Sequence, residues 1–304
     1  MQSPPVPTFP ESVPPAAAPL VGGYRLGALI GRGSIGDVHV ATEPVTGQQV
    51  AIKLLRPVSD ASDDERSLAR QRFLAEAETA RLLNHPDIVR VLAAGDDHGR
   101  AWMAMELLGG CDLERYTRPA RLLPEPVVLR LTERLACALA FAHSRGVVHR
   151  DVKPANVLVD WSSGRVTLTD FGIARAAGAE STRTGIVLGT PVYMAPEQLA
   201  GGLADVRGDL YAFGVLLFQL LTGRLPHESH SLGDLLRQVA NEPAPDLRQL
   251  RPDLPAALAD LVAQLLDKSP ARRPRDAQAV ADALAQVAAA LRVPPAQSGP
   301  MSRG

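Results

Sequence analysis

One short stretch of the chain, His149 to Asn156, carries the residue types best suited to chemistry. Short apolar segments flank it on both sides, so we predict a loop between two buried elements. The loop places a carboxylate (Asp151), an ammonium (Lys153) and an amide oxygen (Asn156) close to one another. These groups can accept a proton, hold a phosphate oxygen and bind a hard metal ion. An ordinary loop has little reason to gather them, so the pattern indicates a functional site.

A second carboxylate follows further along the chain. Asp170-Phe171-Gly172 comes directly after the strand-like segment Val166 to Thr169. Such a tripeptide is common and means little by itself. Across a hairpin from Asn156, however, Asp170 can supply a second oxygen ligand to the same metal ion.

A glycine-rich segment runs from Gly31 to Val38. Glycines at this spacing let backbone N–H groups approach phosphates, because no Cβ intervenes. The same spacing opens dinucleotide-binding folds, and it also occurs in ordinary glycine-rich turns. A dinucleotide site needs a helix after the third glycine, whereas the alternating segment Val38-His39-Val40 follows here. We therefore interpret the segment as a flap between two strands that covers a nucleotide.

Lys53 ends the apolar run Val50-Ala51-Ile52 and is one of only three lysines in the chain. A lysine on a strand is often merely solvated, but a retained lysine in an arginine-rich chain suggests a need for a compact ammonium. We expect it to hold the α- and β-phosphates and to require a carboxylate from the following helix. Glu76 and Glu78 are the candidates. They lie about 200° apart on a helix, so only one can face Lys53, and we favour Glu76.

The elements that must position these groups fall into two parts. The first part is rich in strands, with one helix that Asn84-His85-Pro86 should end. Its expected strands are Tyr24 to Ile30, Asp37 to Thr42, Gln48 to Leu55, Ile88 to Ala94 and Ala101 to Glu106, and its expected helix is Arg66 to Leu83. Beyond Gly109 the periodicity is helical, over Glu125 to Ser144, Val206 to Thr222, Leu232 to Asn241, Ala256 to Asp267 and Ala277 to Leu291. This predicts an α+β chain with a small sheet lobe, a larger helical lobe and the site between them.

Composition limits the classes of function. The chain has 304 residues, is 46% hydrophobic and has a net charge of −1, so it can bury a large core and shows no general affinity for nucleic acid. Two cysteines fit a reducing cytoplasm, and no apolar stretch or leader predicts membrane insertion. Residues 1–20 hold seven prolines and residues 294–304 are similar in character, so we expect both tails to lack a fold.

Taken together and in order, the motifs at Gly31 to Val38, Val50 to Lys53, His149 to Asn156, Asp170 to Gly172 and Ala195-Pro196-Glu197 resemble those of the eukaryotic-like protein kinases, in particular the bacterial Hanks-type serine/threonine kinases. The resemblance covers nearly all of the chain outside its tails. It implies a bilobal kinase domain over residues 21–293, with the sheet lobe at about 21–108 and the helical lobe at about 109–293.

The resemblance also implies a role for each group. Asp151 would be the catalytic base and Lys153 would steady the γ-phosphate of ATP. Asn156 and Asp170 would hold Mg²⁺, or Mn²⁺ in its place. Lys53 and Glu76 would form the ion pair that positions the phosphates. The nucleotide would contact Ile30, Gly31, Arg32, Gly33, Ser34, Ile35, Gly36, Asp37, Val38, Ala51, Lys53, Met105, Glu106, Leu108 and Leu158.

Substrate class and control can be inferred in the same way. Lys153 and Thr190 resemble the pattern of serine/threonine kinases, in which Thr190 would help shape the acceptor site. The small, polar stretch from Ala176 to Gly185 resembles an activation segment, and we expect autophosphorylation at Thr182 or Thr184, with the phosphate held by Arg150. A flexible hydroxyl-rich loop without modification is the alternative. Glu197 and Arg273 resemble a buried ion pair that braces the helical lobe.

Three other functions share parts of this pattern. A catalytically dead kinase scaffold would have lost one of the key residues, and none is missing. A small-molecule phosphotransferase would lack Ala195-Pro196-Glu197 and the long activation segment. An ATP-sensing module would bind the nucleotide without turnover. The expected partners are therefore proteins with serine or threonine acceptors, with a homodimer possible for autophosphorylation in trans.

Overall fold

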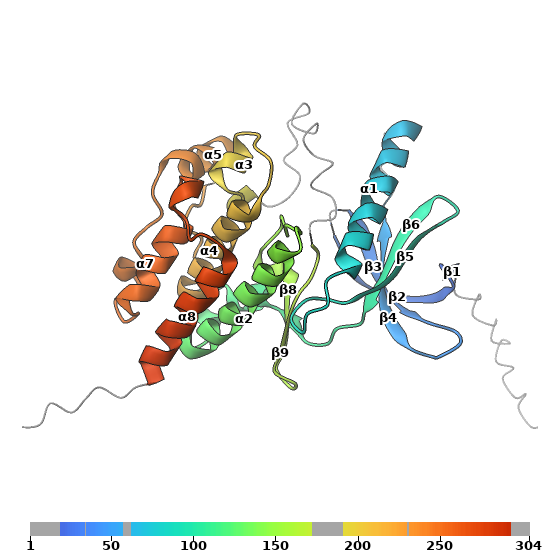
Figure 1. The fold of residues 1–304 in the computed structure, drawn as a ribbon, viewed down its shortest axis with the longest axis horizontal. Coiled ribbons are helices and arrows are strands. Elements are labelled where there is room, and N and C mark those ends of the chain that lie inside the picture. The colour runs from blue at the N-terminus through green and yellow to red at the C-terminus, as the bar shows by residue number, and fades with distance from the viewer. Residues whose placement is uncertain (1–18, 34, 57–61, 172–190, 230, 293–304) are drawn as a thin grey trace, which may run out of the picture.

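We describe the fold from a computed structural model of the chain. The structure describes residues 19–33, 35–56, 62–171, 191–229 and 231–292. Figure 1 shows two lobes, with strands in the N-terminal lobe and mainly helices in the C-terminal lobe. This confirms the predicted α+β architecture.

The sheet lobe is a six-stranded antiparallel sheet in the order β1-β2-β3-β4-β6-β5. Its strands are β1 (Leu20–Val21), β2 (Tyr24–Arg32), β3 (Gly36–Thr42), β4 (Gln49–Leu55), β5 (Val91–Asp97) and β6 (Arg100–Glu106). Two apolar clusters fill its two faces. One gathers around Ile52 and Trp102, and the other joins Met103 to the helix that covers the sheet.

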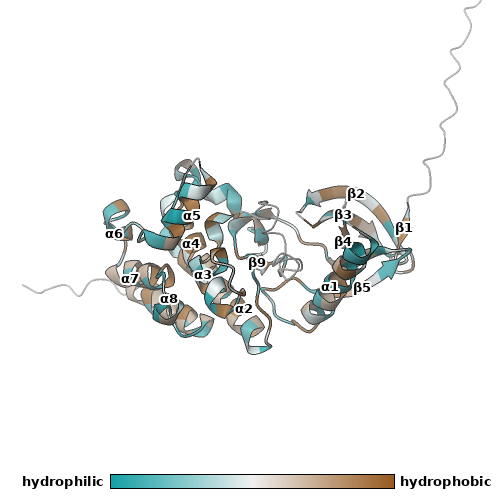
Figure 2. Cartoon of the chain, turned by 90° about the horizontal axis from the view of Figure 1, so that it is seen from above, coloured by the Kyte–Doolittle hydropathy of each residue, from teal (hydrophilic) through white to brown (hydrophobic). Residues whose placement is uncertain are grey.

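That helix, α1 (Asp63–Arg81), lies alongside β5 and β6 (Figure 1), and Figure 2 shows it next to β5 from another side. It begins with a capping box in which Ser62 and Glu65 exchange hydrogen bonds, a pattern that satisfies two of the free N–H groups at a helix start. Phe73, Ala77 and Ala80 recur at helical spacing and are its buried residues. The remaining positions are mostly polar, so a single apolar stripe holds α1 on the sheet.

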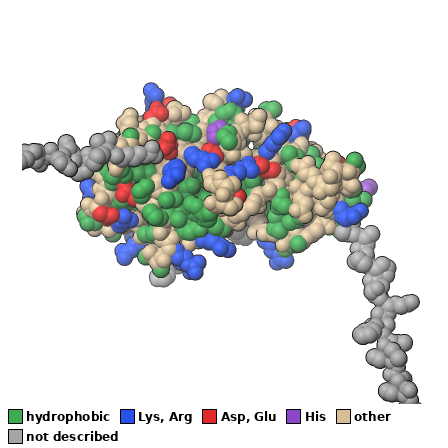
Figure 3. All heavy atoms as spheres, turned by 90° about the horizontal axis from the view of Figure 1, so that it is seen from below, with side chains coloured by type: hydrophobic (Ala, Val, Ile, Leu, Met, Phe, Trp, Pro, Cys, Tyr) green, Lys and Arg blue, Asp and Glu red, His purple; other side chains and the backbone are tan. Residues whose placement is uncertain are grey.

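The helical lobe is built around α4 (Val206–Thr222), which is buried over nearly its whole length. The other helices are α2 (Glu125–Ser144), α3 (Pro196–Leu199), α5 (Leu232–Asn241), α6 (Leu247–Leu250), α7 (Ala256–Leu265) and α8 (Ala277–Arg292). Helix α8 packs along α2. On the face in Figure 3, hydrophobic side chains gather over this lobe, and basic and acidic groups are interspersed. No helix in the described ranges is both long and apolar enough to span a bilayer.

A three-stranded sheet at the junction of the lobes carries the expected site. It contains β7 (Cys111–Asp112), β8 (Val157–Asp160) and β9 (Arg165–Leu168) in that order. The hairpin of β8 and β9 pairs Val157 with Leu168, so the loop that precedes β8 and the segment that follows β9 leave the sheet side by side. This is the hairpin geometry expected for Asn156 and Asp170.

One predicted strand begins later than expected. The sequence pattern predicts a strand from Ile88 to Ala94, but β5 starts at Val91. Ile88 instead makes an isolated bridge to Leu168 and packs into the core of the helical lobe. The segment after α1 therefore contacts both lobes. The alternation of apolar residues in the sequence could not predict these contacts.

Candidate active site

Asp209, near the start of α4, holds the loop from His149 to Asn156 in place through hydrogen bonds. The buried Asp209 carboxylate accepts hydrogen bonds from the backbone N–H groups of His149 and Arg150, both at 2.7 Å, and contacts Nε2 of His143 at 2.8 Å. Arg150 has a φ of 65°, a left-handed conformation that costs a non-glycine residue roughly 1–2 kcal/mol. The two hydrogen bonds to Asp209 stabilise that turn and so fix the backbone position of the next residue, Asp151.

The His149 side chain links this loop to the segment that carries Asp170. Its Nε2 lies 2.9 Å from the carbonyl oxygen of Thr169, and its Nδ1 accepts from the N–H of Asp151 at 3.2 Å. A carbonyl can only accept, so the imidazole proton lies on Nε2. Burial lowers the pKa of His149, which keeps the ring neutral in this arrangement. The ring also packs 4.5 Å from that of Phe171, centroid to centroid.

Asp151, Lys153 and Asn156 form one hydrogen-bonded group. Oδ2 of Asp151 accepts from Nζ of Lys153 at 2.7 Å and from Nδ2 of Asn156 at 2.9 Å. The same Asn156 nitrogen also donates to the Asp151 backbone oxygen at 2.8 Å. The amide nitrogen is thus directed at Asp151, which leaves the oxygen of the Asn156 side chain as the atom suited to a cation.

Asp170 lies directly beside this group. The N–H of Thr169, its neighbour in the chain, donates to the backbone oxygen of Asn156 at 2.9 Å. Oδ1 of Asp170 pairs with Nζ of Lys53 at 2.7 Å, and Lys53 is nearly fully buried. Desolvation opposes ionisation of Asp170, but the Lys53 ammonium outweighs it, so the pKa of Asp170 lies below its usual value. Asn156 and Asp170 together offer the oxygen donors that Mg²⁺ prefers, so the donor set fits a magnesium ion.

The expected ion pair between Lys53 and Glu76 is not what the structure shows. The carboxylate in contact with Lys53 is that of Asp170. Oε1 of Glu76 lies instead 3.7 Å from Nη1 of Arg150, and Oε2 is buried without a hydrogen-bond partner among the described residues. The position of α1 directs Glu76 toward the loop from His149 to Asn156. Glu78, on the solvent face, pairs with Arg81.

This environment changes the protonation of Glu76. Burial raises the pKa of its carboxyl to about 7, although Arg150, Arg72 and Lys53 all act in the opposite direction. Part of the population is therefore neutral near physiological pH. The residue expected to supply the carboxylate partner of Lys53 is a titrating group in this arrangement.

The glycine-rich segment does lie between strands, as predicted. It joins β2 to β3, and Gly33 donates to the backbone oxygen of Gly36 at 2.8 Å. A Cβ at Gly36 would lie 2.1 Å from the Leu54 carbonyl oxygen, so only glycine fits there. At Gly31, a Cβ would meet Val38 at an ordinary 3.8 Å. Ser34 lies outside the described residues.

Several residues predicted to contact the nucleotide lie on adjoining strands. Val38 pairs with Lys53 across β3 and β4, and Ala51 pairs with Met105 across β4 and β6. Leu158 is on β8. The backbone N–H of Glu106 donates to the carbonyl oxygen of Arg90, and the Glu106 side chain accepts from Arg165 at 2.7 Å. The Glu106–Arg165 ion pair joins the end of β6 to the start of β9. No sequence motif predicted this pair.

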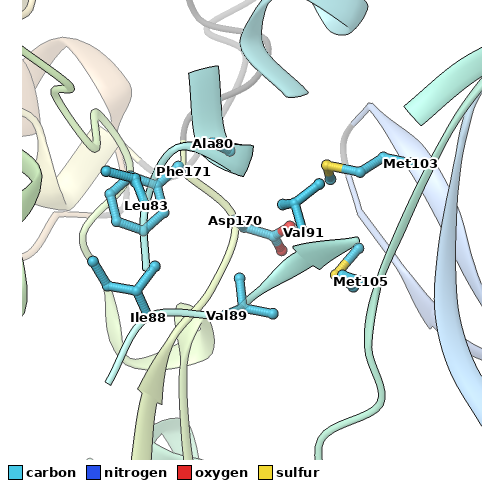
Figure 4. A pocket seen from close by; sticks show the side chains of 9 residues that line it. All are labelled: Ala80, Leu83, Ile88, Val89, Val91, Met103, Met105, Asp170 and Phe171. Atoms are coloured by element: carbon cyan, nitrogen blue, oxygen red, sulfur yellow. The ribbon is translucent and has the colours of Figure 1, made fainter. Parts of the chain in front are cut away.

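Behind Met105 lies the small apolar pocket shown in Figure 4, about 10 Å³ in volume. Its lining side chains come from the end of α1, from the segment between α1 and β5, from β5 and β6, and from Asp170 and Phe171. Met105 is part of its wall.

The remaining predictions concern an ion pair in the helical lobe and three threonines. Arg273 donates to both oxygens of Glu197, at 2.6 and 2.8 Å, and is itself buried, so the predicted brace is present. Thr182, Thr184 and Thr190 lie outside the described residues. A further brace that the sequence did not signal joins Arg134 of α2 to Asp87, the residue before Ile88.

Comparison with known proteins agrees with this geometry. The family model for the protein kinase domain matches residues 24–285. The chain belongs to the protein kinase family. It is 41% identical to the serine/threonine-protein kinase pkn3 of Myxococcus xanthus over 84% of this chain and 48% of that protein. It is 38% identical to PknA of Mycobacterium tuberculosis over 95% of this chain and 67% of PknA.

Solved structures lead to the same family. The kinase domain of PknI from Mycobacterium tuberculosis superposes with a TM-score of 0.71 at 32% identity, covering 90% of this chain and 99% of that domain. Rad53 in complex with AMP-PNP gives a TM-score of 0.70 at 26% identity, covering 86% of this chain and 64% of that one. The present kinase domain thus has the bilobal kinase fold, and the chain spans about half the length of pkn3.

Proposed function

We propose that this kinase domain transfers the γ-phosphoryl group of ATP to serine or threonine hydroxyls of proteins. The observation that carries the proposal is the convergence of Asp151, Lys153 and Asn156 with the Lys53–Asp170 pair at the junction of the two lobes. A protein scaffold without catalysis has no need for this set of charges. The serine/threonine kinases among the relatives, and the AMP-PNP bound by Rad53, support the choice of acceptor and nucleotide.

Each residue has a role that follows from its contacts. Asp151 is held by Lys153 and Asn156, so its carboxylate is fixed in position to accept the hydrogen of an incoming hydroxyl. Lys153 lies 2.7 Å from that carboxylate, where its ammonium can reach a phosphate oxygen of a bound nucleotide. Asn156 and Asp170 would hold Mg²⁺, which when bound neutralises phosphate charge. Lys53 would add a second cation to the α- and β-phosphates.

Several finer points belong to the same proposal. Autophosphorylation at Thr182 or Thr184 would give Arg150 a dianionic partner in addition to Glu76. Thr190 would help to shape the acceptor site. The kinase domain would span residues 21–293 and act in the cytoplasm, a location that fits the two free cysteines, Cys111 and Cys137. The substrates are proteins, and a second copy of the chain is a candidate substrate.

The test is a phosphotransfer assay with γ-labelled ATP and Mg²⁺, with and without a generic basic protein. Asp151→Asn should abolish incorporation into serine and threonine, because the variant cannot accept the proton. Asp63→Asn is the matched control, since it makes the same change at a fully exposed carboxylate. Wild-type protein that binds ATP but labels nothing would overturn the proposal in favour of a scaffold or a nucleotide sensor.

A further inference from the structure

Lys268 is the lysine that the proposed function does not use. The chain has only three lysines, and Lys53 and Lys153 both belong to the phosphate site. Each of those two ammonium groups contacts a carboxylate at 2.7 Å. Lys268 differs in kind, because no carboxylate of the described residues lies within ion-pair distance of its Nζ. A half-buried amine without an ion pair requires another explanation.

The partner of Lys268 is a buried imidazole. Its Nζ lies 3.0 Å from Nε2 of His227, and 5.8 Å from the centre of the Tyr211 ring on α4. An ammonium can only donate, so Nε2 of His227 is the acceptor and the imidazole is neutral. Burial, followed by the repulsion of Lys268, lowers the pKa of His227 to about 4. The amine is therefore in contact with an imidazole that stays neutral at physiological pH and accepts its hydrogen bond.

The charged groups around the amine favour its neutral form. Burial and the nearby Arg273 guanidinium lower the pKa of Lys268 to about 8, against smaller opposing effects of Glu242 and Asp267. Glu242 is itself paired with Arg237 at 2.6 Å. With a pKa of about 8, roughly a quarter of the amine is neutral at pH 7.5, compared with about a thousandth for an ordinary lysine. The neutral amine is the nucleophilic form.

Lys268 also lines a cleft. The cleft has a volume of about 610 Å³ and lies between α7 and the segment from Asn241 to Arg248, remote from the phosphate site. Arg248 and Arg272 line it as well. Asp246 and Asp267 line the cleft too, and each pairs with one of these arginines. The Arg272 guanidinium is nevertheless 78% exposed, and its 3.9 Å contact with Asp267 is longer than a hydrogen bond, so Arg272 can bind a small anionic reagent.

We propose that Lys268 is a site of covalent acylation, with His227 as its proton acceptor and a small acyl phosphate as the acyl donor. The neutral amine attacks the acyl carbon, an N–C bond forms, and the C–O bond to phosphate breaks. Inorganic phosphate leaves, and the amine proton passes through Nε2 of His227 to water. The product is an uncharged amide beside Arg273, the residue that braces Glu197.

The experiment treats the full chain with acetyl phosphate from pH 6.5 to 9.5 and follows each lysine by peptide mass spectrometry. Lys153, which is similarly half-buried but paired with a carboxylate, is the internal standard. We expect Lys268 to be acetylated at least about tenfold faster than Lys153, with a rate that levels off near pH 8 to 9. The N-terminal amine is distinguished by its own peptide.

Two variants test the role of the imidazole. His227→Phe removes the acceptor and should slow acetylation of Lys268 several-fold, whereas His227→Gln keeps an acceptor oxygen and should retain most of the rate. An unchanged rate at Lys153 shows that each variant is folded, and Lys268→Arg should remove the fast phase. Equal rates at Lys268 and Lys153, or a Lys268 rate that still rises steeply between pH 9 and 9.5, would overturn the proposal.

Discussion

Glu76 Oε1 lies 3.7 Å from Nη1 of Arg150, which places a carboxylate of the sheet lobe against the residue that precedes the proposed catalytic base. The contact is longer than a hydrogen bond, and the other oxygen of Glu76 is buried without a hydrogen-bond partner among the described residues. An incompletely satisfied buried carboxylate is costly, and its protonation relieves part of that cost. This residue therefore couples pH to the stability of the domain.

The first prediction concerns that coupling. The pKa of Glu76 in the folded chain, about 7, lies above its ordinary value of 4.5. Between these two pH values the folded protein keeps a proton that the unfolded chain has lost, so its contribution to stability falls as pH rises to about 7. Glu76→Gln should remove this slope and be about 1 kcal/mol more stable than wild type at pH 8, as measured by urea unfolding.

The same variant should be less active. Glu76 contacts Arg150, the residue before the proposed base Asp151, and a neutral amide cannot replace that charge. Glu78→Gln is the matched control, because Glu78 is exposed and pairs only with Arg81 on the surface. Its free energy of unfolding should stay within about 0.5 kcal/mol of wild type at both pH 5 and pH 8. If Glu76→Gln and wild type kept the same difference in stability at pH 5 and 8, the assigned titration would be wrong.

The chemistry of the site could be predicted because each motif lies within one local element. Asp151, Lys153 and Asn156 share a single loop, and β-hairpin geometry alone brings Asp170 to them. The partner of Lys53 could not be predicted in the same way. It depends on how α1 is placed against the helical lobe, and sequence spacing fixes only which face of α1 carries Glu76.

The interactions that the sequence did not signal are those between distant segments. Ile88 continues an alternating pattern, yet it packs in the other lobe, since tertiary contacts override local periodicity. The Glu106–Arg165 pair spans 59 positions, and the Lys268–His227 contact spans 41. Nothing in the local sequence around either partner specifies the other.

The second prediction tests the support of the catalytic loop. Asp209→Asn keeps the shape of the side chain but replaces one of the two oxygens that accept from His149 and Arg150. One backbone N–H then faces an NH₂ group, and the left-handed turn at Arg150 loses part of its support. We expect kcat to fall at least about tenfold with little change in KM for ATP, because Lys53 and Asp170 are unaffected. Steady-state kinetics at varied ATP would show this, and a change confined to KM would contradict it.

The third prediction compares two neighbouring arginines. Arg273 is buried and holds both oxygens of Glu197, whereas Arg272 is 78% exposed and lies 3.9 Å from Asp267. Arg273→Ala leaves the Glu197 charge without its partner and should cost roughly 3–5 kcal/mol of folding free energy. Arg272→Ala should cost less than about 0.5 kcal/mol. Chemical denaturation of both variants provides the test, and similar losses in the two would argue against the brace.

The fourth prediction separates two glycines of the flap. Gly36→Ala would place a Cβ 2.1 Å from the Leu54 carbonyl oxygen, a backbone atom that cannot move without shifting β4. Because β4 carries Lys53, the variant should lose about 1–3 kcal/mol of stability and should also bind ATP more weakly. Gly31→Ala, whose Cβ meets Val38 at 3.8 Å, should leave stability within about 1 kcal/mol of wild type. Thermal unfolding with and without ATP measures both effects. Equal behaviour of the two variants would mean that β3 and β4 can separate at Gly36, and that the close approach of these strands does not position Lys53.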